Sequence, residues 1–194
     1  MSEKITGDPL GESQVLVAIQ NTLADKPGVL AGARALSHFG EHALGWIGTA
    51  AAGYAVAYLQ GKPEDSPERI GWLTVGASAF TAHAASVVLK RIVRRPRPHH
   101  PDIRIGVGTP SKLSFPSSHA TSSTAALVAM ANMWGNPAPL VGIPTMATSR
   151  LVLGVHYPTD VALGSVIGAT TAMAAKSTVG RVVRGRRRTK KKKK

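Results

Sequence analysis

The 194-residue sequence contains no cysteine, so no disulfide framework contributes to its fold and nothing indicates its redox compartment. Charge is nearly missing from one long region, because Arg150 and Asp160 are the only charged residues between Lys112 and Lys176. A soluble domain carries many more charges on its surface, so this scarcity disfavours a soluble protein. Aromatic residues make up 5% of the chain and are not interleaved with the basic residues, which disfavours a nucleic-acid partner.

The N-terminus lacks the basic-then-apolar order of a signal peptide, so internal helices would direct the chain to a membrane. Positive charge is concentrated at the other end, where residues 180–194 carry ten of the fourteen net positive charges. We therefore expect three parts. Residues 1–42 would form amphipathic and partly membrane-embedded helices, residues 43–178 a membrane core, and residues 179–194 a disordered basic tail.

Five mainly apolar runs have about the length of 20 residues that a membrane-spanning helix needs. They cover residues 43–60, 70–89, 119–135, 138–155 and 158–175. Residues 15–23 predict an interfacial helix, and residues 28–39 a partial sixth span. Ala, Gly, Ser and Thr are frequent in these runs and allow helix backbones to approach closely in lipid. The sequence predicts an all-α transmembrane bundle of five to six membrane helices, with a soluble Ala-rich bundle as the alternative.

Three short polar motifs lie at the ends of these runs. Lys90 and Arg97 end the second run, residues 116–119 open the third, and residues 149–160 surround the turn into the fifth. Because consecutive spans alternate in direction, we expect all three motifs at one side of the bundle. The basic tail would lie on the other side, and since positive residues prefer the cytoplasm, we expect the site on the outer face.

The cations of these motifs suit a phosphate group. Lys90 and Arg97 are seven residues apart, which places them on one helix face, and Arg150 comes from another helix. Arginine supplies a planar fork of donors and lysine a point charge. The alternative is that basic residues at a helix end contact lipid headgroups. We favour that interpretation for three of them, Arg91, Arg94 and Arg95.

The segment Pro116-Ser117-Ser118-His119 is typical of a turn that enters a helix. The hydroxyls and amides of Ser117 and Ser118 would hold phosphoryl oxygens at the positive end of the helix dipole. The alternative is a plain N-cap, a position that serine often occupies. His119, at the start of the helix, is placed to protonate a leaving alkoxide.

His156 and Asp160 are four residues apart, with Pro158 suited to the first helical turn between them. Asp160 would accept a hydrogen bond from one ring nitrogen of His156, which fixes the tautomer and leaves the other nitrogen free to attack. A carboxylate in a membrane segment needs such a partner. The alternative is a purely structural His–Asp pair.

No metal site is compelling. His99 and His100, with Asp102, lie in a proline-rich loop without a second group of ligands. His38 and His42 have helical spacing with Glu41 between them, but such a trio more often consists of interfacial or substrate-facing groups. We therefore expect no metal cofactor.

The three motifs together resemble the pattern of the type 2 phosphatidic acid phosphatase (PAP2) superfamily: K-x6-RP, PSGH and SR-x5-H-x3-D. Lys90 to Pro98 matches the first motif, and Ser149 to Asp160 matches the third. The second departs once, because Ser118 stands where glycine is usual and limits the local dihedral angles.

This resemblance implies a multi-span helical phosphatase that acts without a metal. His156 would attack phosphorus to form a phosphohistidine, His119 would protonate the leaving oxygen and then activate water, and Asp160 would orient His156. The implied phosphate-binding residues are Lys90, Arg97, Ser117, Ser118 and Arg150.

Three further segments, residues 15–20, 36–42 and 108–117, resemble a branch of this superfamily that acts on a polyprenyl-phosphate-linked ribose 5-phosphate. That resemblance implies a plasma-membrane enzyme of arabinan precursor synthesis. One alternative is a polyprenyl-pyrophosphate or phosphatidate-type phosphatase, which would use the same residues. The other is a non-enzymatic basic membrane protein that binds anionic lipid through its tail.

Overall fold

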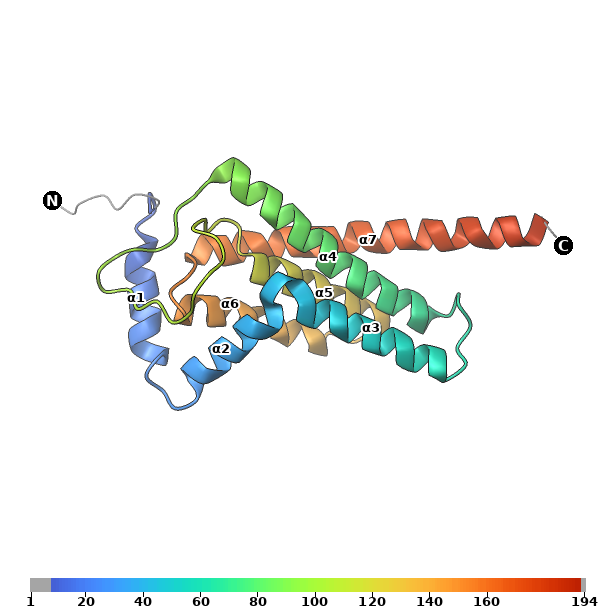
Figure 1. Cartoon of the computed structure of the whole chain (residues 1–194), viewed down its shortest axis with the longest axis horizontal. Coiled ribbons are helices and arrows are strands. Elements are labelled where there is room, and N and C mark those ends of the chain that lie inside the picture. Colours follow the sequence, from blue (N-terminus) through green and yellow to red (C-terminus); the bar gives the residue numbers. More distant parts are fainter. Residues whose placement is uncertain (1–7, 193–194) are drawn as a thin grey trace.

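The computed structural model describes residues 8–192, and helices joined by turns and loops make up this range (Figure 1). The helices are α1 (Glu12–Leu23), α2 (Val29–Gly40), α3 (Leu44–Leu59), α4 (Pro67–Val93), α5 (Ser118–Trp134), α6 (Gly142–Val152) and α7 (Pro158–Lys192). Two short 3-10 segments, η1 (Glu41–Ala43) and η2 (Ala138–Val141), precede α3 and α6. Each predicted helical run corresponds to one of these α-helices, so the all-α prediction is confirmed.

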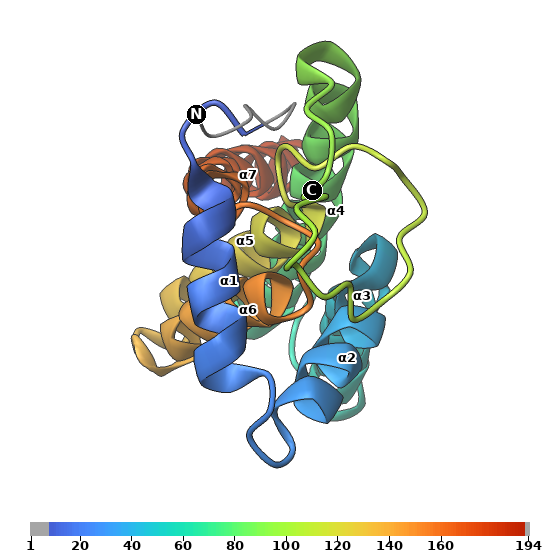
Figure 2. The same ribbon diagram turned by 90° about the vertical axis from the view of Figure 1, so that its left-hand side faces the viewer.

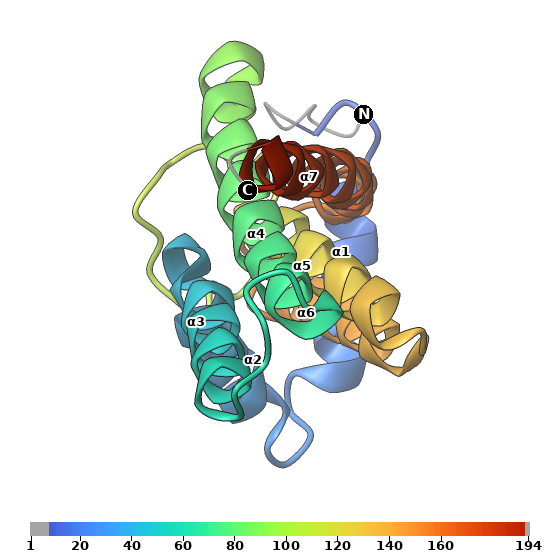
Figure 3. The same cartoon turned by 90° about the vertical axis from the view of Figure 1, so that its right-hand side faces the viewer.

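Four helices, α3, α4, α5 and α7, pack along one another and form the body of the bundle (Figure 3). The helix α1 lies across one end of this body and contacts α6 and α7 there (Figure 2). The long loop between α4 and α5 runs over the same end. This end of the molecule therefore gathers the segments that carry the polar motifs.

Small residues bring α5 and α7 into close contact. A Cβ atom added to Gly168 would lie 2.3 Å from the carbonyl oxygen of Thr121, and one on Gly164 would lie 3.1 Å from that of Ser117. Neither position has room for a side chain, so the start of α7 is held against the start of α5. The adjoining core between α3, α4 and α5 is also built largely from alanine, with Val75 and Met130.

The expected number of membrane spans is not confirmed. Among the described residues, only α4 is both long and apolar enough to cross a membrane by length and composition. Two of the other runs form shorter helices than predicted, α3 with 16 residues and α6 with 11, and α5 has the predicted 17 residues. At 1.5 Å per residue these helices fall below the ~30 Å of a hydrocarbon core.

The predicted basic tail also differs from expectation. We expected residues 179–194 to be disordered, whereas α7 continues as a helix as far as Lys192 and extends beyond the rest of the bundle (Figure 1). Arginine and lysine are strong helix formers, and the preceding turns of α7 supply the nucleus that a new helix would lack. Residues 193 and 194 lie outside the described residues.

Candidate active site

The three polar motifs meet at one cavity of about 640 Å³ at the end of the bundle where α1 lies. Its walls include six of the eight residues predicted for the site: Lys90, Arg97, Ser118, His119, Arg150 and His156. The expected convergence of distant motifs is therefore observed. The two exceptions are Asp160, which lies behind His156, and Ser117, and both are fully buried.

His156 sits in the turn between α6 and α7 with both ring nitrogens facing defined groups. Its Nε2 atom lies 3.3 Å from Nη1 of Arg97. Its Nδ1 atom lies 3.6 Å from Oδ2 of Asp160 and has no hydrogen-bond partner among the described residues, so the two groups are adjacent but the expected hydrogen bond is not formed. Because the guanidinium can only donate, Nε2 is the acceptor in the contact with Arg97, and the proton of a neutral ring belongs on Nδ1 beside the carboxylate. Nε2 thus presents a lone pair toward the cations, as a nucleophile requires.

The charge state of His156 follows from its surroundings. The side chain is only 2% exposed. Burial lowers the pKa of His156 well below its usual value, and the nearby Arg97, Arg150 and Lys90 lower it further. The imidazole is therefore neutral at pH 7 and keeps the lone pair on Nε2, which faces Arg97.

Arg97 leaves the loop after α4 and reaches two backbone carbonyl groups. Its Nε atom donates to the oxygen of Ser111 at 2.7 Å and its Nη1 atom donates to that of Val155 at 2.6 Å. Burial lowers the pKa of Arg97 to about 10, which leaves it fully charged at pH 7. The two carbonyl groups hold this cation beside His156.

Arg150, near the end of α6, has donors without partners. Its side chain is 2% exposed, and its Nε and Nη1 atoms are buried without a hydrogen-bond partner among the described residues. Buried donors are nearly always satisfied, and an unpaired guanidinium is particularly costly. A bound oxyanion beside Arg150 would place a negative charge next to this otherwise unpaired cation.

Lys90 has internal partners instead. Its Nζ atom donates to the carbonyl oxygens of Pro116 at 2.6 Å, Ser114 at 2.9 Å and Leu113 at 3.3 Å. These contacts use all three N–H donors of the ammonium group. Lys90 therefore fixes the loop that precedes α5 and contributes its positive charge to the cavity.

The two serines of the second motif have different positions. Ser117 is the N-cap of α5, with its Oγ atom accepting from the backbone of Ala120 and its own N–H donating to the carbonyl oxygen of Asp160 at 3.0 Å. It does not line the cavity, and the N-cap alternative describes it. Ser118 does line the cavity and lies 2.7 Å from the hydroxyl of Ser86.

His119 is held by the end of α2. Its Nε2 atom lies 2.8 Å from the carbonyl oxygen of Ser37. Since a carbonyl oxygen only accepts, Nε2 carries the proton in this contact. A Cβ atom on Gly40 would lie 2.6 Å from Cδ2 of the same ring, so α2 packs directly against the imidazole. The sequence did not indicate this role for α2.

A buried series of ion pairs connects Asp160 to the N-terminal helix α1. Arg95 donates to Oδ1 of Asp160 at 3.0 Å and to Oε2 of Glu12 at 2.6 Å, and it stacks 4.0 Å above the ring of Tyr157. Glu12 also accepts from the backbone of Thr159 at 2.7 Å.

We expected Arg95 to contact lipid headgroups, and that interpretation is wrong because its partners lie inside the protein. Glu12 was missed altogether. Sequence spacing gave no signal for a pair 83 residues apart.

With this geometry in place, the relatives of the chain identify its family. The PAP2 superfamily model matches residues 71–184. The chain belongs to the PAP2 superfamily. The expected resemblance is thus confirmed over more than half of the sequence.

Two curated relatives extend the match beyond the family core. The chain is 63% identical to the decaprenylphosphoryl-5-phosphoribose phosphatase of Mycolicibacterium smegmatis over 156 residues, covering 80% of this chain and 82% of that protein. It is 52% identical to the protein of the same name from Mycobacterium tuberculosis over 180 residues, covering 93% and 97%.

Proposed function

We propose that this protein is a membrane phosphatase that removes the 5-phosphate of decaprenylphosphoryl-5-phosphoribose, leaving decaprenylphosphoryl ribose and inorganic phosphate. The observation that carries the proposal is the arrangement of His156 and Arg150. Both residues line the cavity: the buried neutral imidazole of His156 turns Nε2 toward Arg97, and Arg150 has two buried donors without a partner among the described residues. This is the combination that nucleophilic phosphoryl transfer needs.

In the first proposed step, Nε2 of His156 attacks phosphorus. A P–N bond forms while the bond between phosphorus and the C5 oxygen of the sugar breaks. Arg97 and Arg150 stabilise the charge on the equatorial oxygens, and Ser118 offers a hydroxyl at the start of α5. His119 starts this step protonated on both ring nitrogens: the Nε2 proton stays on the carbonyl oxygen of Ser37, and Nδ1 gives its proton to the leaving sugar oxygen.

In the second step, water attacks the phosphohistidine. His119, now without the proton it gave away, accepts one from the water, and the P–N bond breaks to release phosphate. Asp160 faces Nδ1 of His156 throughout and stabilises positive charge on the ring during both steps. All groups in this sequence belong to the protein, its substrate or water.

Support for a lipid substrate comes from the apolar surface as well as from the relatives' names. Large apolar side chains are exposed on α3, α4 and α7, among them Leu59 (81%), Phe80 (62%) and Val166 (59%). Such surface suits lipid rather than water. We propose that the bundle is embedded in the plasma membrane, with shorter helices accommodated by local thinning, and that the product feeds arabinan precursor synthesis.

The decisive assay is phosphate release by purified protein in detergent with EDTA. We expect turnover of decaprenylphosphoryl-5-phosphoribose that exceeds turnover of undecaprenyl pyrophosphate and phosphatidate. His156→Ala should lower kcat by roughly 10⁴-fold or more, with an unchanged melting temperature as the control for folding. Turnover of undecaprenyl pyrophosphate alone would favour the alternative phosphatase, and full activity of His156→Ala would contradict the mechanism.

The side of the membrane on which the catalytic cavity lies needs its own experiment. Counting helices and the positive-inside preference support a cytoplasmic C-terminus and a catalytic cavity on the outer face. A reporter that is active only in the cytoplasm, fused after Lys194, should be active. A reporter that is active only outside the cytoplasm, at the same position, should stay silent, and the reverse pattern would overturn the assignment.

A further inference from the structure

One wall of the cavity has no part in the proposed chemistry, although it touches a catalytic ring. This wall consists of the end of α2 and η1. It contacts His119 through the carbonyl oxygen of Ser37 and through Gly40, which leaves no space between helix and imidazole. Whatever lies next to His119 inside the cavity therefore also lies next to this wall.

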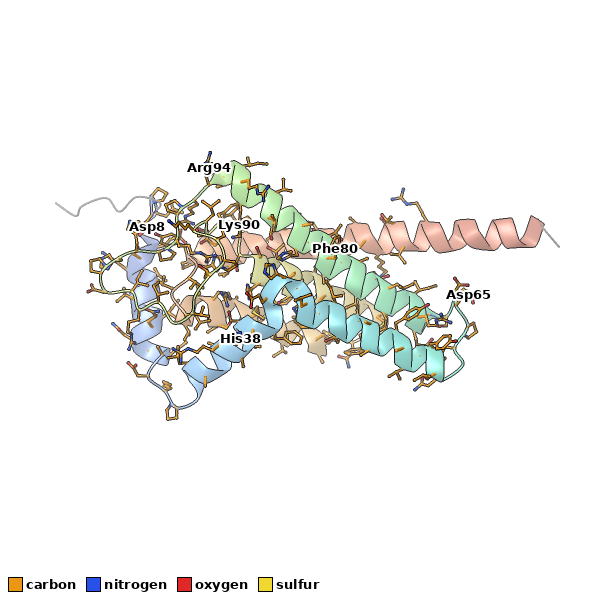
Figure 4. All side chains as sticks on the ribbon, in the orientation of Figure 1. Asp8, His38, Asp65, Phe80, Lys90 and Arg94 are labelled. Atoms are coloured by element: carbon orange, nitrogen blue, oxygen red, sulfur yellow. The ribbon has the colours of Figure 1, made fainter. Side chains whose placement is uncertain are left out.

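Three polar side chains of this wall line the cavity: His38, Glu41 and His42. In Figure 4, His38 and Lys90 lie toward the same end of the bundle, and Asp65 lies at the opposite end. His83 of α4 also lines the cavity, and its ring packs edge-on against that of His42 with the two centroids 5.7 Å apart. The group offers a carboxylate that accepts hydrogen bonds and imidazoles that both donate and accept.

The backbone of η1 adopts a conformation that side chains disfavour. His42 has φ 50° and ψ 22°, and the next residue, Ala43, has φ 60° and ψ 12°. Neighbouring non-glycine residues with left-handed backbone are unusual and concentrate at ligand sites. The turn projects Glu41 and His42 from the end of α2 toward the cavity instead of continuing the helix.

The direction of phosphoryl transfer specifies which part of a substrate meets this wall. The attacking and leaving atoms lie roughly in line through phosphorus, so the leaving oxygen faces away from His156. His119 has to reach that oxygen to protonate it. The group bonded to the oxygen thus lies beside His119 and against α2 and η1. In the proposed substrate this group is the ribose.

We propose that Glu41, His42 and His38 bind the hydroxyl groups of this sugar and select a sugar-bearing lipid phosphate over a sugar-free one. The inference rests on the proposed function and names the part of the same site that recognises the headgroup. A carboxylate can accept from two neighbouring hydroxyls at once, an arrangement that a lipid phosphate without a sugar cannot use. A site built for hydroxyls discriminates strongly against substrates that lack them.

Two variants test this subsite without disturbing the turn. Glu41→Gln keeps the size of the side chain but removes its charge. His42→Asn removes the ring and retains a residue that tolerates left-handed backbone. The matched control is Glu68→Gln, the same chemical change in the first turn of α4, at the opposite end of that helix from Lys90.

Each variant is measured with three probes: decaprenylphosphoryl-5-phosphoribose, the sugar-free farnesyl phosphate, and inhibition by vanadate, which reports the phosphoryl end alone. For Glu41→Gln and His42→Asn we expect kcat/KM for the ribosyl lipid to fall about 10- to 100-fold. Farnesyl phosphate turnover and vanadate inhibition should change by less than about twofold, and Glu68→Gln should match the wild type on all three.

Three results would overturn the subsite. The first is that the wild type turns over the ribosyl lipid and both variants have the same kcat/KM for it. That result would leave the proposed function intact. The second is an equal loss on all three probes, which assigns the wall to general support of His119. The third is a wild type that hydrolyses farnesyl phosphate but not the ribosyl lipid, which rejects the proposed function together with the subsite.

Discussion

The two imidazoles of the proposed mechanism are held in contrasting ways. His156 is backed by side-chain charges, since Asp160 leads to Arg95 and then to Glu12 of α1. His119 is backed by main chain, because Ser37 offers a carbonyl group and Gly40 offers close packing. The nucleophile side therefore depends on a buried electrostatic chain, and the acid side on the fit of a helix. Both supports extend to N-terminal helices outside the family motifs, to Glu12 of α1 for His156 and to the end of α2 for His119.

Among variants that keep both imidazoles, the largest effect is expected at the proposed oxyanion site that the two sides share, Arg150. Arg150→Ala should lower kcat/KM by about 10²- to 10³-fold and weaken vanadate inhibition to a similar degree, because it removes the two unpartnered donors. Arg150→Lys should recover part of the loss, since it restores the charge without the planar fork. Steady-state kinetics with both variants would show this order. Equal vanadate inhibition of wild type and Arg150→Ala would contradict it.

The next largest effect should come from the acid side. Gly40→Ala places a methyl group against His119 and should lower kcat about 10- to 100-fold, since a displacement of about 1 Å has that consequence in catalysis.

The same helix provides a matched control for Gly40→Ala. A Cβ atom at Gly32 meets nothing within 4 Å, so Gly32→Ala should keep full activity and stabilise α2 by about 0.5–1 kcal/mol. Thermal melting and turnover of the two variants make the comparison. Identical activity of Gly40→Ala and Gly32→Ala would show that the packing against His119 is unimportant.

A smaller loss is expected on the nucleophile side. Glu12→Gln removes the carboxylate that pairs with Arg95 and should lower kcat about tenfold, with KM and vanadate inhibition nearly unchanged. Glu12 and Arg95 belong to the same series of ion pairs. The double variant Glu12→Gln/Arg95→Met should therefore have a kcat only slightly below that of Arg95→Met alone.

Asp25→Asn serves as the control for that series of ion pairs. It breaks the ion pair between Asp25, whose side chain is 73% exposed, and Arg104, whose side chain is 52% exposed. Arg104 lowers the pKa of Asp25, but an exposed pair contributes little to stability. Asp25→Asn should leave kcat unchanged. A loss as large as that of Glu12→Gln would indicate a general effect of disturbing the N-terminal region.

The smallest expected effect is a lowered pKa of His156. Burial and three cations lower the pKa of His156, so the ring stays neutral as the pH falls through 6.5 and gains its proton only in more acidic solution. NMR titration of the free protein with labelled histidine should therefore give a midpoint below 6.5 for His156. A midpoint above 6.5 would mean that the cations do not act on this ring as the geometry indicates.

The sequence predicted the helices well because their signals are local. Apolar runs, the proline at 158 and the serine at 117 mark positions where helices begin, and the structure has helices there. The expected number of spans is not confirmed, because composition does not reveal that α6 has only 11 residues, with η2 before it.

The candidate site was predictable as far as its motifs extend. Lys90, Arg97, His119, Arg150 and His156 do meet, because alternating helices return them to one end of the bundle. Their partners were not predictable. The contacts of Lys90 with loop carbonyl groups, of Arg95 with Glu12 and of His119 with α2 depend on tertiary packing between distant segments, for which sequence spacing holds no signal.

The central claim, that the nucleophile is His156, is tested most directly by trapping the intermediate. The His119→Ala variant, which lacks the group that activates water, is mixed with p-nitrophenyl phosphate, whose leaving group needs no proton from His119, and is then quenched in alkali and analysed by peptide mass spectrometry. The account predicts a phosphoryl group on the imidazole of His156 in this variant and none in the double variant with His156→Ala. Phosphate on another residue, or wild-type turnover without any phosphorylated histidine, would contradict it.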